Sequence, residues 1–195
     1  MQPPDPMNAM RWLLDREEID DALRRYARGV DRGAWQLVRS AYHDDAFDDH
    51  GDFKGGVDAL VAWLHERFDG LDNSVHQLSN CLIERAGDDL ALVETYFVSS
   101  RVIPPPVAES GEMGDEDALC RQAWGRYVDR FERRDGAWRI AQRRVVLDAR
   151  MTFVVTGTAR SAGPNWGSRD GSDALWVQRA EIGLHNGEAG LTSSA

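Results

Sequence analysis

The first clear pattern along the chain is that of an amphipathic helix. Between Arg16 and Trp35, apolar residues recur at the three- and four-residue spacing of a helix that buries one face: Ile19, Ala22, Leu23, Tyr26, Ala27 and Val30. The next position on that face is Asp31, and Gly33, a residue type that commonly ends helices, follows it. Because burying an unpaired carboxylate is costly, we expect Asp31 to have a partner inside the protein.

Two shorter helices are predicted after the first. Residues 34–42 place apolar side chains on one helical face, and a turn-rich segment with a short strand at residues 46–47 follows. Residues 57–68 then repeat the helical spacing, and Gly70 ends this third helix.

From residue 74 onward the period changes to that of strands. Residues 74–100 contain two strand-like runs joined at residues 86–89, and residues 120–151 contain two more that turn at residues 135–136, so both segments are predicted hairpins. Residues 103–117 include three consecutive prolines and are expected to form a loop. Three helices followed by long antiparallel strands predict an α+β fold.

The two ends of the chain differ from this middle part. Residues 1–10 are proline-rich and predict a flexible lead-in, and residues 11–151 form the predicted domain. Residues 152–195 are an extension with no clear period, apart from a candidate strand at residues 151–157 and a candidate helix at residues 172–184. Because this extension contains two tryptophans, we expect it to pack, on a neighbouring subunit.

Composition narrows the classes of function. A chain of 195 residues with 42% hydrophobic residues can bury a full core, and its net charge of −10 argues against a nucleic-acid partner. No run approaches the ~20 apolar residues of a membrane span, and the N-terminus lacks the pattern of an export signal. We therefore expect a cytoplasmic protein with no membrane partner. Cys81 and Cys120 lack metal-binding spacing and are interpreted as small buried residues.

Residues 43–50 contain two histidines and four aspartates, which raises the possibility of a metal site. Zinc sites favour sets richer in histidine, and closely spaced acids in a turn more often form a solvated surface. We therefore predict no metal here. As the functional alternative, Asp49 or His50 would contact substrate near the rim of a pocket.

Several segments resemble the SnoaL-like branch of the nuclear transport factor 2-like superfamily: residues 26–31, 42–51, 75–80, 93–97, 125–148 and 167–176. The resemblance implies a cone-shaped, bent antiparallel sheet that encloses a pocket together with three N-terminal helices. Enzymes of this superfamily that work without a cofactor include scytalone dehydratase, the dehydrochlorinase of hexachlorocyclohexane and bile acid 7α-dehydratase. Such enzymes are commonly trimers.

In those three enzymes an aspartate at the end of the first helix pairs with a histidine on the first long strand, positions held here by Asp31 and His76. The resemblance implies that His76 removes a proton from carbon, while Asp31 orients the ring and stabilises the imidazolium. Tyr26 would protonate a leaving oxygen or bind a carbonyl oxygen; its alternative is a purely structural place in the helix core.

Further pocket residues are assigned from alternation along the predicted strands. Arg144 is in phase with Trp138, and the resemblance implies that such an arginine holds an anionic or carbonyl oxygen. Arg143, on the opposite face, is the rival for this role. Phe97 and Trp124 are candidate substrate-binding residues.

These features predict a cofactor-independent lyase that acts on a hydrophobic, ring-containing, possibly aromatic small molecule, in a homo-oligomer with a trimer favoured. The reaction would be dehydration, dehydrohalogenation or retro-aldol loss of formaldehyde. The alternatives are an isomerase or cyclase using the same pair, a non-catalytic small subunit of a ring-hydroxylating dioxygenase, and a ligand-binding module. Asp31 and His76 together favour catalysis, because a binding pocket has no need of an oriented imidazole.

Overall fold

The computed structural model describes residues 5–71, 73–103, 118–155 and 166–184. Along the chain the elements are α1 (Pro6–Arg32), α2 (Trp35–Ser40), β1 (Tyr42–Asp49), β2 (Lys54–Gly56), α3 (Val57–Phe68), β3 (Val75–Arg85), β4 (Leu90–Ile103), β5 (Ala118–Arg134), β6 (Ala137–Val155) and α4 (Ala174–Glu181). Three helices thus precede the long strands, which confirms the predicted α+β class.

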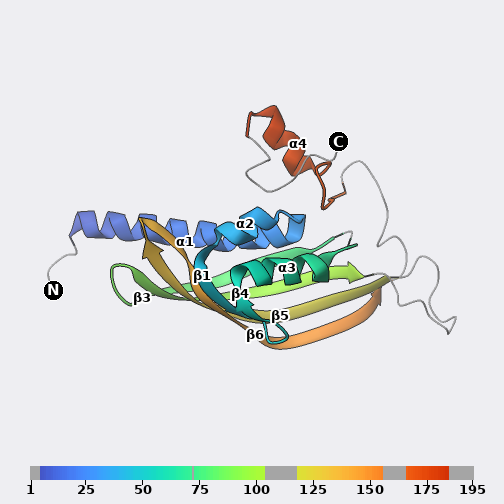
Figure 1. Ribbon diagram of the computed structural model, residues 1–195, viewed down its shortest axis with the longest axis horizontal. Coiled ribbons are helices and arrows are strands. Elements are labelled where there is room, and N and C mark those ends of the chain that lie inside the picture. The colour runs from blue at the N-terminus through green and yellow to red at the C-terminus, as the bar shows by residue number, and fades with distance from the viewer. Residues whose placement is uncertain (1–4, 72, 104–117, 156–165, 185–195) are drawn as a thin grey trace.

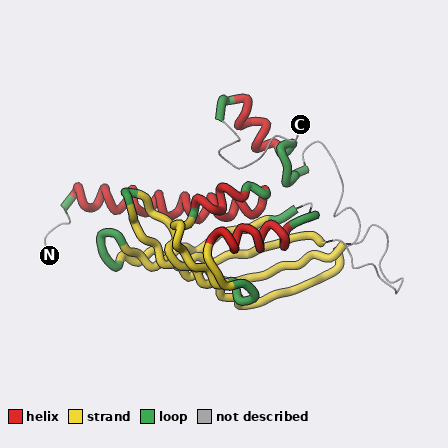
Figure 2. Tube along the Cα trace, viewed as in Figure 1, coloured by secondary structure: helices red, strands yellow, loops and turns green. Residues whose placement is uncertain are grey.

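The six strands form one sheet in the order β2-β1-β6-β5-β4-β3. All neighbours are antiparallel except β1 and β6, which run parallel, so the sheet is mixed where a wholly antiparallel one was expected. Register shifts between β5 and β6 add bulges, which bend strands and increase their twist. Figures 1 and 2 show the curved sheet with α1, α2 and α3 lying along one of its faces, as in the expected cone.

The core lies between these helices and the inner face of the sheet. Every apolar residue of the predicted stripe on α1 is buried: Ile19, Ala22, Leu23, Tyr26, Ala27 and Val30. All of them except Ala27 join one cluster with Leu60 and Leu64 of α3 and with Val93 and Ile140 of the sheet. Burial of this stripe fixes how α1 is rotated, and therefore directs Asp31 inward at its end.

Helix α1 begins earlier than the helical stripe suggests. The side chain of Asp5 accepts a hydrogen bond from the backbone N–H of Met7 (3.1 Å), and Pro6 occupies the first turn, where its missing N–H carries no penalty. Residues 6–10 are therefore helical rather than a flexible lead-in. At the other end Gly33 adopts the left-handed conformation (φ 66°), which ends the helix where the sequence predicts.

Both predicted hairpins are present. Strands β3 and β4 meet across residues 86–89, and Asp135 and Gly136 both have positive φ (52° and 80°) in the tight turn between β5 and β6. The predicted helix at residues 34–42 is shorter, because Tyr42 opens β1. The candidate strand after residue 151 is the continuation of β6. Residues 104–117 of the predicted loop lie outside the described residues.

The predicted C-terminal helix is present as α4 and packs on its own chain. Asp173 caps it by accepting a hydrogen bond from the backbone N–H of Leu175 (3.0 Å). Trp176 is 1% exposed and lies with Ala34 and Leu37, next to the end of α1. The expected contact of the C-terminal extension with a neighbouring subunit stays a prediction. Among the described helices, none has the length and apolar character needed to cross a membrane.

The outer face of the sheet, turned away from the helices, carries large exposed hydrophobic side chains: Leu82, Leu92, Tyr96, Met151 and Phe153. An apolar surface of this kind marks contact with another protein surface. We expect a homotrimer, with a mass by multi-angle light scattering of about three times the 21.9 kDa of one chain. A single peak at the mass of the monomer would contradict this.

Candidate active site

Asp31 and His76 form a close pair at the junction of α1 and β3. Nδ1 of His76 lies 2.6 Å from Oδ1 of Asp31, which also accepts a hydrogen bond from the Ser74 hydroxyl (2.9 Å). The backbone N–H of His76 donates to Oδ2 of Asp31 (2.7 Å). Only 8% of the His76 side chain and 13% of the Asp31 side chain are exposed. The carboxylate thus fixes the position of the imidazole and holds its proton on Nδ1. In the neutral ring Nε2 is then the nitrogen without a proton.

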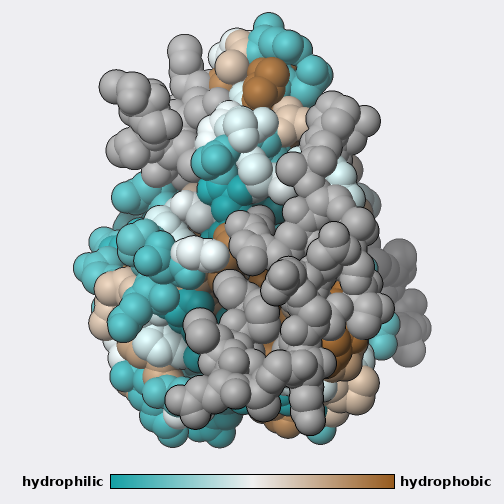
Figure 3. All heavy atoms as spheres, turned by 90° about the vertical axis from the view of Figure 1, so that its right-hand side faces the viewer, coloured by the Kyte–Doolittle hydropathy of each residue, from teal (hydrophilic) through white to brown (hydrophobic). Residues whose placement is uncertain are grey.

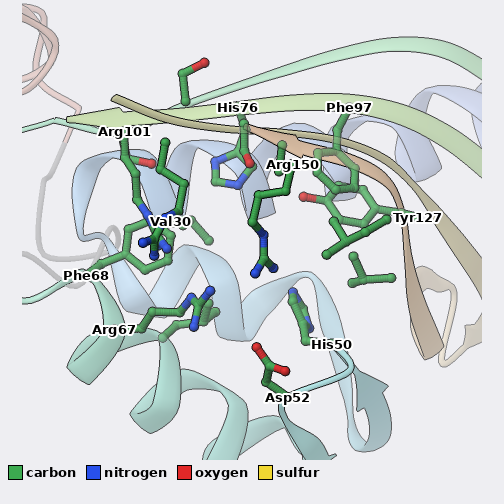
Figure 4. Close-up of a pocket in the computed structure, with 18 of the residues that line it drawn as sticks. Val30, His50, Asp52, Arg67, Phe68, His76, Phe97, Arg101, Tyr127 and Arg150 are labelled. Carbon is green, nitrogen blue, oxygen red and sulfur yellow. The ribbon is translucent and has the colours of Figure 1, made fainter. Parts of the chain in front are cut away.

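The imidazole of His76 lines a pocket between the helices and the inner face of the sheet (Figure 4). The empty space, its open mouth included, is about 760 Å³. Leu64, Phe68, Phe97 and Val145 give it an apolar wall. This arrangement places a basic nitrogen beside a surface suited to a hydrophobic molecule.

A second aspartate–histidine pair lies at another wall of the same pocket. Nδ1 of His50 pairs with Oδ1 of Asp48, and Oδ2 of Asp48 accepts a hydrogen bond from the Tyr42 hydroxyl (2.8 Å). Nε2 of His50 lies 3.2 Å from the hydroxyl of Tyr26, which also lines the pocket. Figure 4 shows the rings of His76 and His50 well apart, with the pocket between them. Sequence reasoning included His50 but missed the role of Asp48.

Tyr26 belongs to the core and also lines the pocket, and its catalytic role stays a prediction. Burial raises the pKa of its phenol well above the ordinary value, and the hydroxyl therefore stays protonated over the working pH range. The Arg143 guanidinium carbon lies 4.4 Å from the centre of the Tyr26 ring and 4.0 Å from that of Tyr127. Tyr26 is therefore a hydrogen-bond donor whose ring is held in place by its packing against Arg143.

Arg143 is itself completely buried and pairs with Asp129. Its Nε and Nη2 donate to the two carboxylate oxygens at 2.8 Å and 2.6 Å, and both side chains are fully excluded from solvent. Burial alone would lower the pKa of Arg143, but Asp129 and Tyr42 outweigh it and hold this pKa well above its ordinary value. Arg143 thus supports the tyrosines of the pocket wall from inside the core.

The structure places Arg144 outside the pocket, exposed and next to Asp49 in the pairing of β1 with β6. The inference from alternation is wrong because the register shifts between Arg130 and Phe131, so that Ile140 and Ala141 are both buried and the phase reverses beyond them. The residues of β6 from Gln142 to the second register shift, opposite Gly125, then face the opposite way.

Of the four candidate substrate-binding residues, His50 and Phe97 line the pocket. Trp124 does not, because the inward positions of β5 are those of Ala123 and Tyr127. Asp49 also lies outside the lining and forms an ion pair with Lys54 (3.0 Å). The catalytic and binding roles assigned to these side chains stay predictions.

Sequence reasoning missed a group of arginines in the pocket lining: Arg67, Arg101, Arg121 and Arg150. Arg101 and Arg121 face each other across β4 and β5. The two residues are separated in the sequence by the predicted loop, so no register could be assigned to them beforehand. They also stand among more than twenty arginines and lysines with no pattern to single them out.

The C-terminal part of the chain reaches the site as well. Nη1 of Arg169 donates hydrogen bonds to the backbone carbonyls of Val30 (2.7 Å) and Asp31 (3.0 Å). These carbonyls belong to the last turn of α1 and lack partners within the helix. Arg169 therefore caps the helix end that carries the catalytic aspartate candidate.

Comparison with solved structures identifies similar folds. The chain is 17% identical to a hexachlorocyclohexane dehydrochlorinase (LinA type 2), with a TM-score of 0.64 over 81% of this chain and 99% of the other. A proposed scytalone dehydratase from Novosphingobium aromaticivorans is 16% identical, with a TM-score of 0.61 over 80% and 99%. A proposed aromatic ring hydroxylase from the same organism is 20% identical, with a TM-score of 0.59 over 72% and 94%. At these identities the likeness establishes the fold.

Comparison with curated proteins gives no significant match. Residues 11–144, well over half of the chain, match the SnoaL-like domain. This match covers most of α1, the pair of Asp31 and His76, and most of the sheet. The protein therefore belongs to the SnoaL-like domain family.

Proposed function

We propose that the protein is a cofactor-independent lyase acting on a hydrophobic, ring-containing small molecule. The observation that carries this proposal is the 2.6 Å contact between Asp31 and Nδ1 of His76, in a pocket with an apolar wall. Two of the similar structures are described as a dehydrochlorinase and a proposed scytalone dehydratase, names that denote elimination reactions. The fold also serves proteins that are not enzymes, so the oriented imidazole is the deciding feature.

His76 acts as the general base in this mechanism. With the proton on Nδ1 held by Asp31, Nε2 is free to remove a proton from a substrate carbon next to the leaving group. The resulting imidazolium is stabilised by the carboxylate of Asp31, which three hydrogen bonds hold in place. The electron pair of the broken C–H bond forms a C=C bond as the leaving group departs.

Tyr26, supported by His50, supplies the acid. When His50 is protonated, its Nδ1–H donates to Asp48 and its Nε2–H donates to the oxygen of Tyr26. The phenolic proton can then point into the pocket and pass to a departing hydroxyl, which leaves as water. With a halide the same base suffices without an acid. In a retro-aldol reaction the base instead takes the proton of a substrate hydroxyl, and a C–C bond breaks to release formaldehyde. The electron pair of that bond stays on the remaining carbon, which the imidazolium of His76 then protonates.

The test is a product screen with ring compounds that carry a hydroxyl, halide or hydroxymethyl group beside an acidic C–H bond. Wild-type protein and His76→Ala are incubated with each compound, and mass spectrometry measures the loss of water, hydrogen halide or formaldehyde. We expect at least one compound to be converted by the wild type alone. A product of unchanged mass would indicate an isomerase instead. Equal conversion by His76→Ala would refute the proposed base.

A further inference from the structure

Four arginines converge on the mouth of the pocket from separate elements. Arg67 lies in the last turn of α3, Arg101 near the end of β4, Arg121 near the start of β5 and Arg150 near the end of β6. Figure 4 shows the side chains of Arg67, Arg101 and Arg150 reaching into the same space between His76 and His50. From the end of the molecule at which these strands finish, Figure 3 shows hydrophilic surface beside hydrophobic patches.

The positive charge of these arginines is poorly balanced within the described part of the chain. Asp52 is the one carboxylate among the described lining residues, and its charge acts to raise the pKa of Arg67. No described carboxylate forms an ion pair with any of the four arginines. Other arginines of the protein do form ion pairs with carboxylates: Arg143 pairs with Asp129, and Arg133 pairs with Asp15. Arg67, Arg101 and Arg121 are partly buried, whereas Arg150 is exposed. A partly buried arginine without an ion pair has a cost, so the retention of the first three calls for a reason.

Their mutual placement adds to this cost. Arg101 and Arg121 are direct cross-strand partners, and like charges at such positions repel. Burial, together with the charges of Arg67, Arg121 and Arg150, lowers the pKa of Arg101 to about 10. Burial and the charge of Arg150 lower the pKa of Arg67 too. A negative group bound among them would relieve both the repulsion and the loss of solvation.

We propose that the molecule bound in this pocket carries an oxyanion group, a carboxylate or a phosphate, held by Arg67, Arg101 and Arg150. The guanidinium group presents paired donors that match the two oxygens of such a group. The apolar body of the molecule lies against the apolar wall of the pocket, which includes Leu64, Phe97 and Val145. This assignment names the substrate class of the lyase, and in that respect rests on the proposed function, although binding itself needs no catalysis.

The test measures the affinity of the full-length protein for 2-naphthoate, for its neutral isostere 2-naphthamide and for 2-naphthyl phosphate by isothermal titration calorimetry. We expect 2-naphthoate or the phosphate to bind about ten- to hundredfold more tightly than the amide, the effect of a charge-assisted hydrogen bond. The stronger of the two anions identifies which oxyanion the site prefers. Equal affinity for anions and amide, or no binding of any of them, would overturn the inference.

Matched variants locate the effect. Arg101→Gln and Arg150→Gln should each lose most of the preference for the anion, and Arg101→Lys should keep part of it. Arg130→Gln, on an exposed side chain of β5 that pairs with Glu132, should leave it unchanged. Circular dichroism melting curves show whether each variant is folded. A preference for anions that survives in both glutamine variants would place the anion elsewhere and refute the assignment.

The two proposals fail separately. His76→Ala should keep the full preference for the anion, because the histidine is not part of the arginine group. If anions bind but no compound is converted, the lyase proposal fails and the anion site stands. If neutral compounds are converted as efficiently as their acids, the anion site fails and the lyase proposal stands.

Discussion

Replacing Asp31 by asparagine is expected to lower kcat by about 10²–10⁴-fold while changing KM little. An amide cannot accept hydrogen bonds at both of its atoms, so one of the three donors that Asp31 now satisfies would face an NH₂ group. The amide also lacks the charge that stabilises the imidazolium. The measurement is steady-state kinetics on a compound identified by the product screen.

Asp15→Asn is the matched control for this variant. Asp15 is on the same helix, is also buried, and forms an ion pair with Arg133 (3.0 Å), but it does not line the pocket. This control should lose stability and keep its turnover. Wild-type turnover in Asp31→Asn, or an equal loss in Asp15→Asn, would show that the carboxylate of Asp31 does not serve the base.

The largest effect on stability is expected from Asp129→Ala. Removing this carboxylate leaves the buried charge of Arg143 without its partner, which typically costs about 3–5 kcal/mol of unfolding free energy. The tyrosine rings stacked on the guanidinium would lose their support as well. Urea denaturation followed by tryptophan fluorescence measures the change through the shift of the midpoint at constant slope.

Glu94→Ala provides the comparison. Glu94 pairs with Arg126 at 2.7 Å, but both side chains are about one-third exposed, so the loss should be below about 1 kcal/mol. Replacing both buried partners, with Asp129→Leu and Arg143→Met, should recover much of the stability lost in Asp129→Ala. Equal effects of Asp129→Ala and Glu94→Ala would mean that the buried pair contributes no more than a surface pair.

Periodicity predicts the inward direction of Asp31, whereas its pairing with His76 was predicted from the family resemblance. The stripe on α1 directs Asp31, and Gly33 sets the end of the helix immediately after it. His76 is the second residue of its strand, before any irregularity could shift the alternation. Over such short distances, helical and strand periods predict direction well.

The face of the sheet to which each side chain of β6 points could not be predicted in the same way. An extra residue near Ala141 reverses the face of the residues that follow it, and nothing in the local sequence marks the shift. A second shift, opposite Gly125, restores the original phase, so Arg150 faces inward as plain alternation from Trp138 would place it. Arg150 was missed because nothing in the sequence distinguishes it from the other arginines. The arginine group also depends on the pairing of β4 with β5 across a long connection, which periodicity does not encode.

Two residues matter when members of this family are compared: Arg169, which caps α1, and Arg150, which lines the pocket. Both residues follow residue 144, where the match to the SnoaL-like domain ends, whereas Asp31 and His76 lie within it. Under the proposed function, relatives can share the base of this core and still differ at the positions of Arg150 and Arg169. Classification by the common domain alone does not take these two residues into account.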